Sequence, residues 1–86
     1  MEEEVGVVVN YFSKIGVAAV EITSGELKLG DAVRFKGATT DFTQKVDSMQ
    51  IEKRPVEKAA AGSTVGIKVK ERVRPKDKVY KIIGGA

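Results

Sequence analysis

The 86-residue sequence contains no cysteine and no histidine. Without cysteine the chain has no disulfide bonds, no thiolate nucleophile and no thiolate metal ligand. Without histidine it lacks the commonest metal ligand and the side chain that most often transfers protons near neutral pH. The twelve aspartate and glutamate residues are scattered and lack the spacing of a calcium-binding loop. We therefore expect no metal and no cofactor.

Other catalytic arrangements are also missing from the sequence. The serines and threonines have no histidine to act as a base. Glu21, Asp47 and Glu52 are not spaced so that two carboxylates meet on an apolar background, which a raised pKa would need. No P-loop motif, G-x-x-x-x-G-K-[ST], is present, so we expect no nucleotide hydrolysis. The sequence predicts that the chain is not an enzyme.

Long apolar runs are absent as well. None approaches the roughly 20 residues that a membrane-spanning helix needs. Met1 is followed by three glutamates, where a signal peptide carries positive charge. We expect no membrane contact and a cytoplasmic location. A chain of this length has room for one domain, which we expect to cover residues 1–86, with four frayed residues at the N-terminus and three at the C-terminus.

The charges that are present are divided unevenly along the chain. Residues 1–43 carry four Lys/Arg against seven Asp/Glu, a balance of −3, and residues 44–86 carry eleven against five, a balance of +6. A basic half of this kind suggests an anionic partner such as RNA. A basic protein without any role in nucleic-acid binding fits the same composition.

Short β-branched runs separated by glycine, proline and polar turns predict an all-β fold. We expect six strands, at residues 5–12, 15–22, 32–36, 42–53, 65–74 and 78–83. The apolar phase slips at Ala18-Ala19 and again within residues 42–53, so a β-bulge is expected at each place. Leu27 and Leu29 are expected to lie in a loop that plugs one end of the fold. Six such strands predict a single closed six-stranded β-barrel.

The segment 59–74, AAAGSTVGIKVKERVR, carries the main candidate site. Its apolar residues alternate with four cations, so in a strand the cations would form one positive stripe. The candidate RNA-binding residues are Lys68, Lys70, Arg72 and Arg74. Tyr11 and Phe12 would add a stacking surface if exposed. The alternative is that the stripe is a solvated outer face or a strand edge that lysines protect from aggregation.

A polar turn between two expected strands is the second candidate site. Its candidate partner-binding residues are Thr39, Thr40, Asp41 and Gln44. Their hydroxyl, carboxylate and amide groups would contact a partner's backbone or base edges, because loops on a rigid scaffold often carry function. The alternative is that Thr and Asp side chains cap the turn, with Phe42 packed in the core.

Four motifs occur in order along the chain: GELKLGDAV at residues 25–33, VDSM at 46–49, AGSTVGI at 61–67 and RPKDKV at 74–79. In this order they resemble the second domain of translational GTPases such as elongation factor Tu, although Lys76 stands where that family has glycine. The whole pattern is also similar to stand-alone elongation-factor-like proteins and to the C-terminal accessory barrel of collagenase-like peptidases. The resemblance implies a β-barrel of the translation-protein type.

Two departures from the GTPase pattern concern recognition of the tRNA end. The chain has Val20-Glu21-Ile22 where those proteins have a G-R-V triplet, and it lacks their acidic residue near Gln50. The sequence still predicts a non-catalytic, translation-related module that contacts tRNA or ribosomal RNA by neutralising phosphates. The alternative is a protein–protein adaptor or an accessory barrel of a peptidase-like or RNA-modifying enzyme. Its contact surface would then be apolar and include Tyr11, Phe12 or the loop of Leu27 and Leu29.

Overall fold

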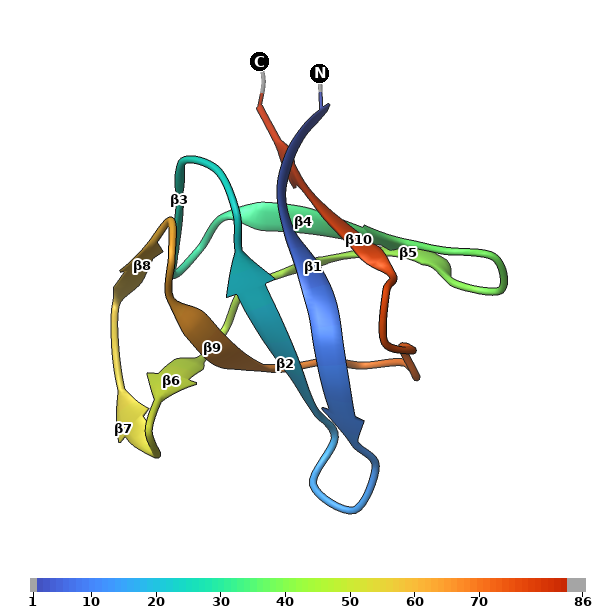
Figure 1. The fold of residues 1–86 in the computed structure, drawn as a ribbon, viewed down its shortest axis with the longest axis horizontal. Helices are drawn as coiled ribbons and strands as arrows, with labels where there is room; N and C mark the ends of the chain where they lie inside the picture. The colour runs from blue at the N-terminus through green and yellow to red at the C-terminus, as the bar shows by residue number, and fades with distance from the viewer. Residues whose placement is uncertain (1, 84–86) are drawn as a thin grey trace.

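The computed structural model describes residues 2–83, which form β-strands joined by turns (Figure 1). The strands are β1 (Glu2–Phe12), β2 (Val17–Ile22), β3 (Glu26–Lys28), β4 (Ala32–Lys36), β5 (Asp41–Lys45), β6 (Met49–Ile51), β7 (Arg54–Pro55), β8 (Lys58–Ala60), β9 (Thr64–Lys68) and β10 (Lys78–Ile82). The predicted all-β class is confirmed. The part of the chain that the structure describes contains no helix long and apolar enough to cross a membrane.

Eight of these strands form one curved antiparallel sheet in the order β5-β4-β10-β1-β2-β9-β6-β7, and β3 pairs with β8 in a small second sheet. The long strand β1 and the shorter strand β10 lie side by side in the middle of the molecule (Figure 1). The predicted closed six-stranded barrel is wrong. Across residues 2–83, the outermost strands β5 and β7 are not paired with each other, so the main sheet stays open.

The sheet stays open because the predicted long strand at residues 42–53 does not exist. This segment contains β5, β6 and a tight turn that leads into β7. Glu52 and Lys53 form that turn with φ angles of 51° and 66°, in the left-handed region. Two-residue hairpin turns of this kind usually contain Asn-Gly. The chain therefore reverses at a place that has no turn signal in its sequence.

The expected bulge near Ala18-Ala19 lies in the partner strand instead. The register between β1 and β2 shifts between Val8 and Asn10, and Asn10 pairs with Ala19. A second shift in β1, relative to β10, falls between Glu4 and Gly6. Gly6 is needed there, because a Cβ atom would lie 2.5 Å from the carbonyl oxygen of Glu21. Bulges add local twist, which helps β1 follow both of its neighbours around the curve.

The core lies inside the curve of the sheet. It consists of Val5, Val8, Ala18, Val20, Ile22, Leu27, Val33, Phe35, Phe42, Val46, Met49, Ala59, Val65, Ile67, Val69, Val73 and Val79. The rings of Phe35 and Phe42 stack with their centroids 5.1 Å apart, so the expectation that Phe42 is a core residue is confirmed. Leu27 is fully buried, but it lies in β3 and not in a loop, while Leu29 is 42% exposed.

The expected fraying of the N-terminus is wrong for Glu2 to Glu4. These residues begin β1 and pair with Ile82, Lys81 and Tyr80 of β10. The expected frayed residues 84–86 lie outside the described part of the chain.

Candidate docking surfaces

The predicted basic stripe does not lie on one strand, because β9 ends at Lys68. The chain then leaves the sheet, and the main-chain N–H of Val69 donates to the carbonyl of Gly16 at 2.9 Å. Val69 and Val73 are both buried, but Glu71 between them is exposed, so the alternation of a half-buried strand is interrupted. Lys68, Lys70, Arg72 and Arg74 are all exposed, but three of them lie outside the sheet.

The next turn, which contains the RPKDKV motif of residues 74–79, is hydrogen-bonded to β1. The N–H of Lys76 donates to the carbonyl of Val8 at 2.7 Å, and the N–H of Val8 donates to the carbonyl of Asp77 at 2.8 Å. The Asp77 carboxylate is buried and accepts from the N–H of Arg74 at 2.9 Å. Lys76 has a φ of 79°, a conformation that favours glycine.

The polar turn does not bring its four predicted residues together as one exposed surface. Thr40 is buried, and its carbonyl accepts from the N–H of Gly37 at 2.7 Å. Asp41 is held by Arg34, and the Gln44 side chain is bound to main-chain groups of other segments. Thr39 is exposed. Most of these polar groups therefore have partners within the chain.

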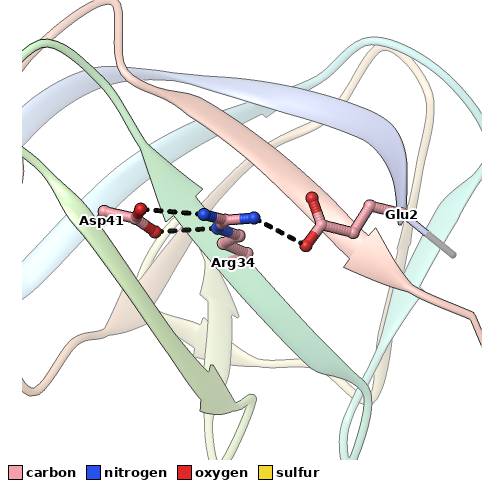
Figure 2. Close-up of polar contacts among 3 residues, drawn as sticks. All are labelled: Glu2, Arg34 and Asp41. Atoms are coloured by element: carbon pink, nitrogen blue, oxygen red, sulfur yellow. Dashed lines mark hydrogen bonds and ion pairs between the residues drawn. The ribbon is translucent and has the colours of Figure 1, made fainter.

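Arg34 joins three strands through two carboxylates (Figure 2). Its Nε and Nη2 donate to the two carboxylate oxygens of Asp41, both at 2.8 Å, and its Nη1 donates to Glu2 Oε2 at 3.0 Å. The hydrogen bonds that Arg34 donates to Asp41 and, less strongly, to Glu2 raise the pKa of Arg34 above its usual value. The same bonds from Arg34 lower the pKa of Asp41 below its ordinary 3.8.

Two further ion pairs lie on the same group of strands. Lys78 is 3.5 Å from Glu4, and Lys81 is 3.3 Å from Asp31. We call the cations Arg34, Lys78 and Lys81, with their carboxylate partners, the paired region. Its charges satisfy one another across β1, β10, β4 and β5, so this region is held together by its own polar contacts.

A small cleft of about 280 Å³ lies between β5 and the segment that follows β9. Its lining residues, which we call the basic cleft, are Gln44, Lys45, Asp47, Ser48, Lys68, Val69 and Lys70. The Gln44 amide spans the cleft: Nε2 donates to the carbonyl of Lys68 at 2.9 Å, and Oε1 accepts from the N–H of Lys70 at 2.9 Å. A side chain thus replaces the backbone ladder that a closed barrel would have here.

A larger open groove of about 680 Å³ lies over β2, β9 and β6. Its lining residues, which we call the apolar groove, are Phe12, Ile15, Val17, Ala19, Gln50, Glu52, Lys53, Thr64, Val65 and Gly66. Phe12 and Ile15 are 46% and 60% exposed. A volume of this size lies within the range of ligand-binding clefts, about 300–1,000 Å³.

Small residues keep the floor of the groove low. Ala19, Gly66 and Gln50 pair side by side across β2, β9 and β6. A Cβ atom at Gly66 would lie 3.1 Å from a methyl carbon of Val17 and 3.4 Å from Cγ of Gln50. The strained turn at Glu52 and Lys53 forms part of the rim. A hollow floor between an apolar wall and a polar rim is suited to receiving side chains of a partner.

Only part of this groove was predicted from the sequence. Phe12 was expected on an apolar contact surface only under the alternative function, and it is exposed in the structure, whereas Ile15 was expected to begin a strand. Ile15 lies in the turn between β1 and β2, where the N–H groups of Ile15 and Gly16 both approach the carbonyl of Phe12. The available signal was the F-S-K-I sequence at residues 12–15, which places two large apolar side chains around a polar turn.

The described residues contain no group of three or more His, Cys, Asp or Glu side chains that could hold a metal ion. The absence of metal, cofactor and catalytic activity stays a prediction.

The fold is similar to that of a C-terminal domain from a protein named as a peptidase. The crystal structure of the C-terminal domain of a protein named as a U32 peptidase, from Geobacillus thermoleovorans, matches with a TM-score of 0.86 at 27% identity. The match covers 94% of this chain and 93% of that domain. The selenomethionine variant of the same domain matches with a TM-score of 0.84 at 28% identity, over 90% of this chain and 96% of that one.

Similarity in sequence leads to the same group of proteins. Two proteins named collagenase, from Porphyromonas gingivalis and its strain W83, are each 49% identical to this chain over 78 residues, or 90% of its length. An uncharacterized protease of Methanocaldococcus jannaschii is 42% identical over 78 residues. The chain spans about a fifth of the length of these curated relatives, 22%, 19% and 19%. No protein-family model matches the chain.

The chain is therefore homologous to collagenases and to the C-terminal domain of a U32 peptidase. The predicted function as a translation-related module that contacts tRNA or ribosomal RNA is wrong, because the relatives in sequence and in fold are named for proteolysis. The likeness to the second domain of elongation factor Tu stays a resemblance of motifs. The alternative prediction, an accessory barrel of a peptidase-like protein, fits these relatives better.

Proposed function

We propose that this chain is a non-catalytic accessory domain of a peptidase-type protein and that its apolar groove docks onto the larger, catalytic part. One observation carries the proposal: the chain corresponds to about a fifth of relatives named collagenase or protease, and to a separately folded C-terminal domain of a U32 peptidase. In those relatives named collagenase or protease, the region that matches this chain is joined to a much larger part of the protein.

The composition of the groove supports docking. Phe12 and Ile15 are two of the most exposed large apolar side chains in residues 2–83. They stand beside polar rim residues at Glu52, Lys53 and Thr64. An apolar centre with a polar rim is the usual anatomy of a protein interface. A neighbour on the same chain has a high effective concentration, so even a modest apolar surface is enough to hold it.

The absence of histidine and cysteine from the whole sequence supports a non-catalytic role. Peptide-bond hydrolysis needs a nucleophile activated by a base, or a metal-bound water. The described residues offer no metal-ligand cluster. Catalytic groups would then belong to the larger part of the peptidase.

The test uses the Porphyromonas gingivalis collagenase in three forms: intact, without the 78-residue region that matches, and with that region replaced by this chain. We expect this chain alone to leave gelatin uncleaved, deletion to lower gelatin hydrolysis, and the replacement to restore it. Phe12→Ser with Ile15→Ser in the replacement should remove the restored activity. The matched control is Val9→Ser with Leu29→Ser, because these side chains are similarly exposed and lie outside the groove.

Hydrolysis by this chain alone would contradict the non-catalytic role. Undiminished hydrolysis after the deletion would contradict the accessory role. Equal loss in both serine pairs, in proteins that melt at the same temperature, would contradict docking through the groove.

A further inference from the structure

We propose that the basic cleft is a second docking site, and that it binds an extended acidic segment of a protein partner. The lining of the cleft has three cations, Lys45, Lys68 and Lys70, against one anion, Asp47. Among residues 2–83 none of these lysines forms an ion pair with a carboxylate. Their charges are therefore balanced by solvent and salt, and a partner that brings carboxylates would replace those ions.

The side chain of Gln44 contacts main-chain groups of all three lysines. The Gln44 amide Nε2 donates to the carbonyl of Lys68 at 2.9 Å and approaches the carbonyl of Lys45 at 3.4 Å, and Oε1 accepts from the N–H of Lys70 at 2.9 Å. These bonds fix the main chain that bears each lysine. A partner would then have to order only the flexible lysine side chains, and pre-organisation of this kind lowers the entropic cost of binding.

The spacing of the lysines favours an extended occupant. Lys68 and Lys70 are exposed on either side of the buried Val69, so both side chains point away from the core. Alternate residues of an extended chain lie about 6.6 Å apart. An extended segment with glutamate or aspartate at every second position presents its carboxylates on one face, where they would meet Lys68 at the end of β9 and Lys70 just beyond it. Charge complementarity of this kind mainly sets the specificity and the rate of association.

The basic cleft and the apolar groove share no lining residue. Binding at the cleft can therefore be measured independently of the accessory role, and either proposal can fail alone.

The test is a fluorescence-anisotropy titration of the chain with a short labelled peptide in which glutamate alternates with serine. A peptide with glutamine in place of glutamate is the neutral reference. We expect the acidic peptide to bind at least tenfold more tightly than the neutral one, and to weaken as salt rises because these charges are exposed. Lys68→Glu with Lys70→Glu should reduce the affinity at least tenfold.

Three further measurements make the result specific to the cleft. Lys28→Glu with Lys58→Glu is the matched control, because it makes the same change in net charge at exposed lysines outside the cleft, and it should change the affinity less than threefold. Gln44→Leu should weaken binding while all three lysines remain. A single-stranded RNA with the same number of charges should bind no more tightly than the peptide.

Equal loss of affinity in the two lysine pairs would overturn the proposal, because net charge alone would then explain binding. Equal binding of the neutral peptide, or tighter binding of the RNA, would overturn it as well. Urea unfolding of each variant checks that the fold is intact, since charge changes at exposed positions usually alter stability only slightly.

Discussion

The paired region and the basic cleft use the same kinds of side chain in opposite ways. In the paired region, Arg34 is shared by Asp41 and Glu2, and Lys78 and Lys81 each face a carboxylate. In the basic cleft, Gln44 contacts the main chain beside three lysines, and none of these lysines forms an ion pair with a carboxylate of residues 2–83. A count of cations therefore does not locate a binding surface. The pairing of each cation within the fold separates structural charge from charge that is open to a partner.

The largest change in stability is expected from a substitution in the core beneath the paired region. Phe35 is fully buried in β4 and stacks on Phe42 of β5. Phe35→Ala should lower the free energy of unfolding by about 3–5 kcal/mol, because it removes packed contacts and leaves a cavity. Urea denaturation measures the loss. A loss below about 1 kcal/mol would mean that polar contacts, and not the core, hold these strands together.

A smaller effect, this time a gain in stability, is expected from a substitution in the segment that joins the two regions. Lys76 adopts a φ of 79° in the turn between the basic cleft and β10. Lys76→Gly should stabilise the fold by roughly 0.5–1 kcal/mol, because glycine adopts this conformation without a Cβ clash but loses more chain entropy on folding. Lys76→Ala, which removes the charge and keeps the Cβ atom, is the control. An equal rise in melting temperature in the alanine and glycine variants would mean that loss of the lysine charge, and not relief of the backbone conformation, stabilises the fold.

The smallest effect is expected from the exposed ion pairs, and it depends on pH. Arg34 lowers the pKa of Asp41, mainly through side-chain hydrogen bonds. Because the folded pKa lies below the ordinary 3.8, the pair contributes stability above pH 3.8 and loses it as the pH falls through the lowered value. Arg34→Gln should therefore destabilise the chain near neutral pH, and its difference from the wild type should shrink in acid.

The control for this pH dependence is Lys36→Gln, which removes a charge near Asp41 without removing a hydrogen bond. It should change the acid limb of the stability profile less than Arg34→Gln does. Urea midpoints measured across the acid range distinguish the two variants. A constant difference between Arg34→Gln and the wild type at every pH would show that the guanidinium acts through packing alone.

Local signals in the sequence predicted the regular part of the fold. The strand expected at residues 32–36 is β4 with the same bounds, because Val33 and Phe35 alternate with charged residues at the period of a half-buried strand. The buried face of Val65, Ile67 and Val69 was also predicted correctly. In each case the neighbours along the chain carry the information that determines the structure.

The remainder depends on contacts between distant residues or on unusual turn residues. Nothing around Gln44 indicates that its amide spans to Lys68 and Lys70, 24 and 26 residues away. Glu52 and Lys53 lack the composition of a hairpin turn, so the reversal between β6 and β7 was missed. The predicted stripe was too long, because charged residues continue to alternate in the sequence past Lys68. In the structure the chain leaves the sheet there, and the buried side chains of Val69 and Val73 hold it in its new path.

The pairing of β1 with β10 also affects how the chain is made. Glu2 to Val7 pair with residues 78–82, so the edge of β1 that faces β10 has no partner until β10 has been synthesised, whereas the other edge pairs with β2. Val5 and Val7 to Val9 are strongly β-forming, and an unpaired strand of this composition readily pairs with other chains. Three glutamates precede it, and like charges of this kind next to an apolar strand oppose aggregation. We therefore expect the acidic start of β1 to oppose aggregation of the nascent strand before β10 is synthesised, and in the folded domain Glu2 and Glu4 form ion pairs.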